Sequence, residues 1–262
     1  MNKFLLAATA IIGLASINAA SAADLALKAP PPPIVVDEWT GGYIGLNLGG
    51  SWGRSATSYT DPDPAFVPFA TSQHMDGVLG GAQIGYNVQF NKNMVAGLEA
   101  DFQGTGQRGT ATFPPVNELI CGAACTSITT SGTLTQKMPW FGTFRARLGV
   151  LPSEHLLLYV TGGLAYAQIK STAATSFVAM TPGGTFTGGM SSSVSNDRAG
   201  WTAGVGAEWM FAKQWSAKLE YLYMDYGHIN DGFTGVGTLA VLGINSHVTD
   251  NVLRAGVNLH FH

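Results

Sequence analysis

Cysteine and histidine are the residue types in this sequence most able to bind a metal or a cofactor. The chain has 262 residues, with two cysteines and six histidines. Cys121 and Cys125 form the motif Cys-Gly-Ala-Ala-Cys, and no histidine is close to them in the sequence. Two cysteines alone rarely make a metal site, and in an oxidising compartment they favour a disulfide. Two free thiols are the alternative.

The histidines are spread along the chain. Three lie near long polar connections (His74, His228 and His247), and three lie near short connections (His155, His260 and His262). Three histidines in each region argue against a single metal or haem site, so we interpret all six as exposed residues at strand ends. We predict no cofactor and no metal. If haem does bind, the first three histidines are the candidates.

A glycine motif and a serine run resemble functional signatures but lack their context. Residues 104–109, Gly-Thr-Gly-Gln-Arg-Gly, match G-x-G-x-x-G. That motif binds a phosphate only between a strand and the N-terminus of a helix. Here Pro114-Pro115 follow without a helical period, so we expect these glycines to end a strand. The serines at 191–193 show no matching histidine and acid, so we expect no enzyme.

Charged side chains at alternating positions of apolar segments say more about this protein than the motifs above, because such residues can form ion pairs on one face of a sheet. They are four acids and four bases: Glu99, Asp101, Glu208, Glu220, Arg145, Arg147, Lys218 and Arg254. Balanced signs predict a narrow enclosed space in which these charges form ion pairs.

The elements that must position these charges are strands, because polarity alternates by twos from Trp39 onward. In residues 201–211, for example, Trp201 and Trp209 share an apolar face opposite Glu208. We predict eight strands, at about 40–54, 76–90, 94–106, 137–151, 156–170, 198–211, 215–226 and 248–261. Short turns are predicted at 91–93, 152–155 and 212–214, and long polar loops at about 55–75, 107–136, 171–197 and 227–247.

Short turns on one rim and long loops on the other are the plan of an outer-membrane barrel. A soluble sandwich would also alternate, but the aromatic residues favour a membrane, since Trp and Tyr prefer its two interfaces. Trp209 and Trp215 flank a short turn, and Trp201, Tyr221 and Tyr223 lie toward the other end. The predicted fold is all-β: an eight-stranded antiparallel up-and-down transmembrane β-barrel.

The predicted barrel constrains its own register and interior. Shifting one strand by a residue would turn Arg145 and Arg147 into lipid, at about 2–4 kcal/mol each near the midplane. An eight-stranded barrel is just wide enough for side chains. We therefore expect no wide permanent pore, although small residues could leave cavities that pass small solutes slowly.

The N-terminal segment has the features of an export signal. Residues 1–22 combine Lys3, an apolar stretch from Phe4 to Ile17 and the cleavage pattern Ala20-Ser21-Ala22. The apolar stretch is shorter than the ~20 residues that a membrane-spanning helix needs. Residues 23–38 contain four consecutive prolines and are predicted to be a periplasmic linker. Residues 39–262 are left for the barrel.

Composition excludes several other classes of protein. Charged residues make up 11% of the chain against a usual ~25%, and hydrophobic residues make up 46%, which excludes disorder. The net charge is −3, and no basic patch supports nucleic-acid binding. The 34 glycines follow no G-X-Y period, which excludes collagen.

Several segments resemble a known family. They are the start Ala23-Asp24-Leu25, the proline-rich linker, and residues 39–50 (WTGGYIGLNLGG), 80–87 (GGAQIGYN), 158–166 (LYVTGGLAY) and 218–223 (KLEYLY). The chain is similar in these segments to the small outer-membrane porin-like proteins of alphaproteobacteria, also called outer-membrane immunogenic proteins. The resemblance implies an eight-stranded outer-membrane barrel that stabilises the envelope and displays surface loops. Some relatives are described as porins or haem binders, and the family has no catalytic residues to carry over.

The predicted function is therefore a non-enzymatic integral outer-membrane barrel with an envelope-structural and surface-antigen role. A small diffusion porin and a haem-binding surface protein are the alternatives. The expected partners are outer-membrane lipid and lipopolysaccharide, the barrel-insertion machinery through the C-terminal strand, and peptidoglycan. One departure from the usual pattern is that Phe261 is penultimate, with His262 after it. We expect insertion to tolerate this change with lower efficiency.

Overall fold

A computed structural model describes residues 38–60, 69–122, 124–236 and 239–261. The predicted signal peptide, the predicted linker up to residue 37, and His262 lie outside the described residues. In the described part of the chain, no helix is long and apolar enough to cross a membrane.

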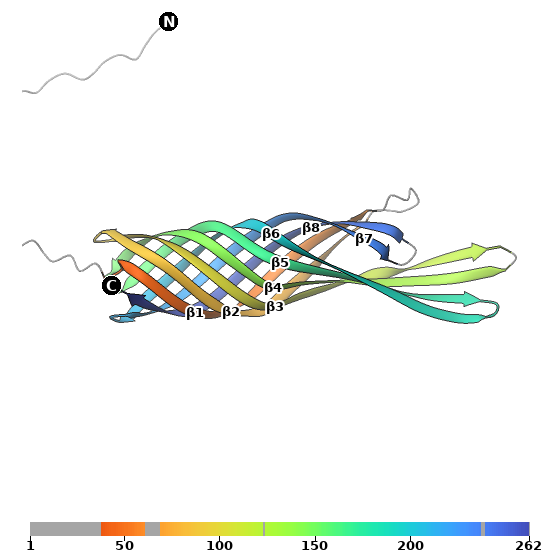
Figure 1. The fold of residues 1–262 in the computed structure, drawn as a ribbon, viewed down its shortest axis with the longest axis horizontal. Helices are drawn as coiled ribbons and strands as arrows, with labels where there is room; N and C mark the ends of the chain where they lie inside the picture. Colours follow the sequence, from red (N-terminus) through yellow and green to blue (C-terminus); the bar gives the residue numbers. More distant parts are fainter. Residues whose placement is uncertain (1–37, 61–68, 123, 237–238, 262) are drawn as a thin grey trace, which may run out of the picture. The chain divides into compact units, whose positions relative to one another are not determined.

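Eight antiparallel strands form one closed barrel in chain order (Figure 1). The strands are β1 (Gly41–Thr60), β2 (Phe69–Asn91), β3 (Met94–Cys121), β4 (Cys125–Ser153), β5 (Leu156–Thr181), β6 (Gly184–Ala212), β7 (Trp215–Val236) and β8 (Leu239–Phe261). β1 pairs with both β2 and β8, so Gly45 lies between Gln83 and Asn258. Closure gives every strand two neighbours, which a sheet in lipid requires because lipid offers no hydrogen bonds to an open edge.

The two rims of the barrel differ as the sequence predicts. One rim, here called the turn rim, carries the short turns at 92–93, 154–155 and 213–214, and the last residue of β8 pairs with Gly42 there. The opposite rim, here called the hairpin rim, carries the ends of the long hairpins. Alternation along each strand places apolar side chains outward: Leu46, Val78 and Leu164 are 71%, 76% and 66% exposed. The apolar face is thus the outer face of the barrel.

The predicted long loops are wrong in extent, because most of these residues continue the strands. β3 and β4 stay paired up to Cys121 and Cys125, and β5 and β6 up to Thr181 and Gly184. These hairpins run beyond the rest of the barrel (Figure 1). The sequences of the predicted loops are rich in Thr, Ser and Gly, and several of their buried positions, such as Ser55, Gln73 and Ser171, are polar, so hydrophobicity does not alternate clearly there. Backbone pairing continues there without that signal, and β-branched Thr favours it.

The barrel interior is layered rather than uniformly polar. Near the turn rim it contains an apolar cluster of Trp39, Val95, Leu151, Leu157, Tyr159 and Met210. Toward the hairpin rim it contains a larger cluster that includes Phe141, Leu222 and Met224. By strand parity, these three residues share a face with the charged residues of β4 and β7, where the sequence predicts polar side chains. Ionisable side chains fill the space between the two clusters, and they form the site that the fold positions.

Candidate functional site

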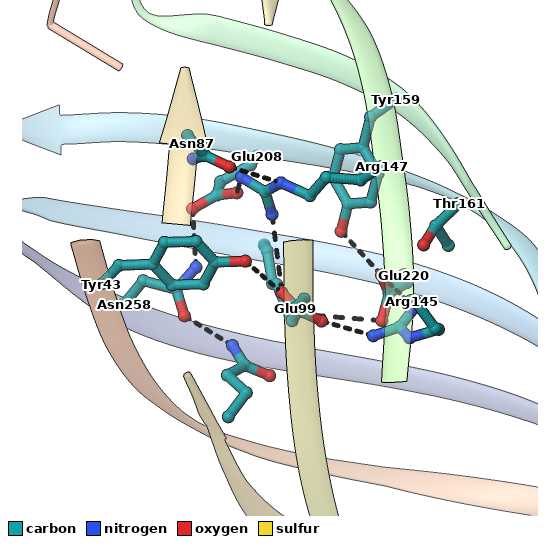
Figure 2. Close-up of polar contacts among 12 residues, drawn as sticks. Tyr43, Asn87, Glu99, Arg145, Arg147, Tyr159, Thr161, Glu208, Glu220 and Asn258 are labelled. Atoms are coloured by element: carbon teal, nitrogen blue, oxygen red, sulfur yellow. Dashed lines mark hydrogen bonds and ion pairs between the residues drawn. The ribbon is translucent and has the colours of Figure 1, made fainter. Parts of the chain in front are cut away.

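The eight charged residues predicted from alternation all point into the barrel interior. They come from five strands: β3 supplies two acids, β4 two arginines, β6 one acid, β7 a lysine and an acid, and β8 one arginine. Cross-strand register places Glu99 opposite Arg145, Glu208 opposite Lys218, and Glu220 opposite Arg254. All eight side chains are buried, and ion pairs join them into one network. Figure 2 shows the part of it around Glu99, Arg145 and Arg147.

Glu99 is the centre of this network. Its carboxylate lies within ion-pair distance of all four bases: Arg145, Arg147, Lys218 and Arg254. The Lys218 ammonium lies 3.0 Å from each of its oxygens, and the Tyr43 hydroxyl donates a hydrogen bond of 2.7 Å. The side chain of Glu99 is 2% exposed, so these groups take the place of water around the carboxylate.

Asp101 and Glu220 connect the two arginines that face each other across the interior. Arg145 and Arg254 donate to Asp101 at 3.0 and 2.9 Å, and the Thr143 hydroxyl donates to it at 2.7 Å. Glu220 accepts from Arg254 at 2.6 Å and from Arg145 at 3.0 Å. Each of these carboxylates therefore neutralises charge contributed by strands on opposite sides of the barrel.

Glu208 is the acid nearest the turn rim. It accepts from Arg147 at 2.9 Å, from Ser216 at 2.5 Å and from Asn258 at 2.6 Å. His260 lies 3.3 Å from it and packs against Trp39 with ring centroids 5.9 Å apart. The expectation that His260 is an exposed rim residue is therefore wrong: β8 turns it inward, where it is 1% exposed.

Two tyrosines and two glycines hold Arg147 in place. The Arg147 guanidinium carbon lies 4.9 Å from the ring centroids of both Tyr43 and Tyr159, a cation–π distance. Each tyrosine ring covers a glycine of the neighbouring strand, Gly85 for Tyr43 and Gly206 for Tyr159, at a distance that leaves no room for a Cβ atom. The glycines are thus needed where the rings approach the backbone.

Chemically, this arrangement is suited to filling space and fixing strand register. Each of the four carboxylates in the network is paired with at least one base. Among the described residues, no group of three or more His, Cys, Asp or Glu side chains could hold a metal ion.

The comparisons with known proteins agree with this architecture. The family model for the outer membrane protein beta-barrel domain matches residues 8–261. The chain belongs to the outer-membrane β-barrel protein family. One relative is the 31 kDa outer-membrane immunogenic protein of Brucella melitensis. It is 35% identical over 265 residues, and the match covers 95% of this chain and 98% of the relative's length. The 22 kDa outer membrane protein of Rhizobium leguminosarum is 27% identical, and the match covers 77% of this chain and 70% of that protein's length.

Among solved structures, the outer membrane protein OprG of Pseudomonas aeruginosa is 9% identical with a TM-score of 0.45, covering 85% of this chain and 98% of its own. Family membership places this barrel in the outer membrane, in contact with its lipid. The outward apolar face of the barrel is then the surface that meets lipid.

The other predicted residues of this outer-membrane barrel lie outside the charge network. The structure joins Cys121 and Cys125 by a disulfide at the tip of the β3–β4 hairpin, with Cα atoms 4.0 Å apart. Residues 104–109 lie within β3, so the expectation that these glycines end a strand is wrong. His228 and His247 lie side by side with ring centroids 4.8 Å apart, and His247 contacts Asp225 at 3.1 Å.

The aromatic residues predicted for the membrane interfaces face outward. Trp209 and Trp215 are exposed beside the turn at 213–214, and Trp201 packs on Tyr223 with ring centroids 5.4 Å apart. Tyr221 is 37% exposed.

Sequence reasoning missed several interior residues of this family member. Tyr43 and Tyr159 belong to the network, and their inward positions follow from the alternation of β1 and β5. Asp250 is also buried, with its carboxylate accepting from Gln107 at 2.7 Å. Its strand position has the same parity as Arg254, which is the signal that could have found it.

Proposed function

We propose that this outer-membrane barrel is a closed, non-enzymatic scaffold of the envelope that displays its long hairpins at the cell surface. One observation carries the proposal: the interior is filled along its length by an apolar cluster, the charge network and a second apolar cluster. Such an interior leaves the barrel wall and the hairpins as the parts available for function.

The filled interior argues against the alternative of a diffusion porin. A porin needs an open polar path, whereas a solute here would have to displace buried side chains such as Phe141 and Leu222, both 0% exposed. It would then have to break ion pairs of 2.6–3.0 Å around Glu220 and Asp101. Removing a partner from a buried ion pair costs about 3–5 kcal/mol. The expected conductance is therefore absent or very small.

The hairpins support a role at the cell surface. β3–β4 and β5–β6 extend furthest from the turn rim, and their tips expose apolar side chains, including Leu119, Ile120 and Phe186. Long connections of outer-membrane barrels face outward and short turns face the periplasm. Relatives of this chain are named immunogenic. We infer that these hairpins are the antigenic part of the molecule.

The haem-binding alternative has less support. The structure gathers His228 and His247, but the third candidate, His74, lies on β2 opposite Arg54 of β1. We therefore keep the scaffold as the proposal.

Export and assembly complete the proposed function. We infer that residues 1–22 direct secretion and that residues 23–38 form a linker that can reach peptidoglycan. We further infer that the insertion machinery recognises the end of β8, where Leu259 and Phe261 alternate on the outer face. Phe261 is 49% exposed on the outer face of the folded barrel, the apolar position that such a signal needs.

Planar-bilayer recording of the purified, refolded protein tests the scaffold proposal. We expect no reproducible single-channel steps, and no swelling of liposomes in small sugars. Detergent without protein and heat-denatured protein are the controls for artefactual currents. Reproducible steps from heat-modifiable, folded protein would overturn the scaffold proposal in favour of the porin.

A further inference from the structure

We propose that a row of three outward-facing bases, Arg108, Lys137 and Lys170, binds the phosphate groups of an anionic lipid of the outer leaflet. This basic row lies on β3, β4 and β5 at the point where the barrel wall passes into the long hairpins. The inference rests on the orientation proposed for the barrel, but not on its closed interior.

The basic row brings three like charges together, and the one acid directly opposite it, Asp76 beside Arg108, forms no ion pair with it within the described residues. Arg108 is the cross-strand partner of Lys137, and Lys137 is the partner of Lys170. All three side chains are exposed, and within the described residues none has a carboxylate within 4.0 Å. Like charges directly opposite each other destabilise a sheet. A bound anion would remove this repulsion, and phosphate groups suit Arg and Lys together.

The other charges facing this region leave a positive excess. Arg54 and His74 are cross-strand partners on β1 and β2. Two acids face the region: Asp76 opposite Arg108, and Asp197 on β6, which accepts a hydrogen bond from Gln168 at 3.3 Å. Arg54 and the three bases of the row thus outnumber these acids by four to two.

An aromatic stack lies next to the basic row, on the side of the turn rim, and indicates where the membrane interface is. Trp140 lies between Phe102 and Tyr166, with ring centroids 5.5 and 5.8 Å from theirs. All three rings face the lipid side of β3, β4 and β5. Since Trp and Tyr gather at the membrane interface, the bases next to them lie at the height of lipid headgroups.

Two breaks in strand register separate the aromatic stack from the basic row. They lie between Gly104 and Gln107 on β3 and between Lys137 and Trp140 on β4. The Thr105 hydroxyl supports the first break by donating to the Met138 carbonyl at 3.0 Å and accepting from the Gln107 amide at 2.8 Å. Register breaks of this kind re-aim side chains at functional positions.

The wall beside the aromatic stack offers a place for the acyl chain of the same lipid. A shallow apolar hollow on the lipid face extends from β7 and β8 across β1 and β2 to β3, where Phe102 lines it; Leu46 and Ile84 line its middle. Phe102 therefore belongs to both the hollow and the aromatic stack. A lipid with its phosphate on the basic row can lay a chain along this hollow.

The basic row is confined to one side of the barrel. From residue 199 to the end of the sequence, the only bases are Lys213 in a turn and Lys218 and Arg254 in the interior. A barrel that attracted anionic lipid without preference would need bases around its whole hairpin rim. The one-sided distribution favours a defined lipid site.

The experiment compares two double variants that remove the same charges from opposite rims. K137Q/K170Q removes two lysines of the basic row, and K92Q/K213Q removes two exposed lysines of the turn rim as the matched control. Binding of fluorescent lipopolysaccharide, and of the same lipid after enzymatic removal of its phosphates, is titrated against protein refolded in neutral detergent. Heat-modifiable migration checks that every variant is folded.

We expect K137Q/K170Q to bind the phosphorylated lipid about 30-fold more weakly, the effect of two basic residues near an anionic surface. The control should bind like the unaltered protein, and dephosphorylated lipid should bind all three proteins weakly. Equal binding by the two double variants would overturn the proposal. If K137Q/K170Q does not fold, undiminished binding of dephosphorylated lipid by the unaltered protein overturns it instead. Full competition by millimolar inorganic phosphate would show an ion site rather than a lipid site.

Micelles also separate this proposal from the proposed scaffold function. Lipid binding in detergent does not depend on conductance, so channel steps in a bilayer would not contradict lipid binding by the basic row. Loss of lipid specificity would likewise leave the closed interior unaffected.

Discussion

At the scale of single residues, Glu99 should contribute most to stability, because four bases converge on its carboxylate. Glu99→Gln keeps the shape of the side chain but removes its negative charge. We expect the free energy of unfolding to fall by about 3–5 kcal/mol, since buried bases lose their partner. Urea unfolding in detergent, followed by heat-modifiable migration, measures the change.

Glu118→Gln is the matched control for this prediction, because Glu118 lies on the same strand but is exposed in the hairpin. Its effect should stay within about 0.5 kcal/mol. A Glu99→Gln protein as stable as this control would show that the network contributes nothing to stability.

Gly206 tests how tightly the tyrosine rings pack on the barrel wall. A Cβ atom at this position would collide with the Tyr159 ring, which also contacts Arg147 and donates to Glu220. We expect Gly206→Ala to lower the free energy of unfolding by about 1–3 kcal/mol through overpacking. At Gly104 an added Cβ meets nothing closer than 3.8 Å, so Gly104→Ala should be close to neutral in the same urea titration. Similar stability of the two alanine variants would contradict the packing described for Tyr159.

The inward direction of the network residues could be read from the sequence, because the parity of a strand decides which side chains share a face. The ion-pair partners of these residues could not be predicted from the sequence. Arg254 meets Asp101 across the interior at 2.9 Å, although 153 positions separate them in the sequence. Such contacts depend on barrel closure and strand tilt rather than on local pattern. His260 was misjudged for a related reason: its place at the end of a strand suggested exposure, whereas its parity pointed inward.

At the scale of elements, the membrane-spanning parts of the strands were predictable and their extensions were not. Where one face meets lipid and the other the interior, polarity must alternate, and the sequence shows it. Beyond the membrane, residues such as 126–130 remain paired in β4, although neither face of the strand is buried there. Phe141 and Leu222 illustrate the opposite limit, because inward positions near the hairpin rim are apolar like the outward ones. Hydrophobicity alone cannot distinguish the two faces there.

The disulfide at the tip of the β3–β4 hairpin gives a prediction at this scale. Cys121 and Cys125 are cross-strand partners at the last pair of the hairpin, far along β3 from Glu99. The bridge closes a loop of only a few residues, which constrains the unfolded chain little. We expect a Cys121→Ser/Cys125→Ser protein to unfold in urea at the same midpoint as the parent. A loss of more than about 1 kcal/mol would mean that the hairpin tip and the barrel unfold as one unit.

At the scale of the whole molecule, the barrel has a direction that its wall alone does not reveal. The two rims differ in the length of their connections and in their charges, with Lys92 and Lys213 at the turn rim and the basic row near the hairpin rim. The proposed antigenic role and the proposed lipid site both require the hairpin rim to face outward. This orientation therefore decides whether either role can operate in cells.

Labelling of single cysteines on intact cells tests the orientation. In the Cys121→Ser/Cys125→Ser background, Thr185→Cys places a thiol on the exposed β5–β6 hairpin, and Lys213→Cys places one in a turn of the opposite rim. A membrane-impermeant maleimide should label the Thr185→Cys protein on intact cells and the Lys213→Cys protein only after the outer membrane is permeabilised. Because the two thiols are comparably exposed, a difference in labelling reports the side of the membrane rather than reactivity. The reverse pattern would place the hairpins in the periplasm, where they could be neither surface antigens nor neighbours of an outer-leaflet lipid.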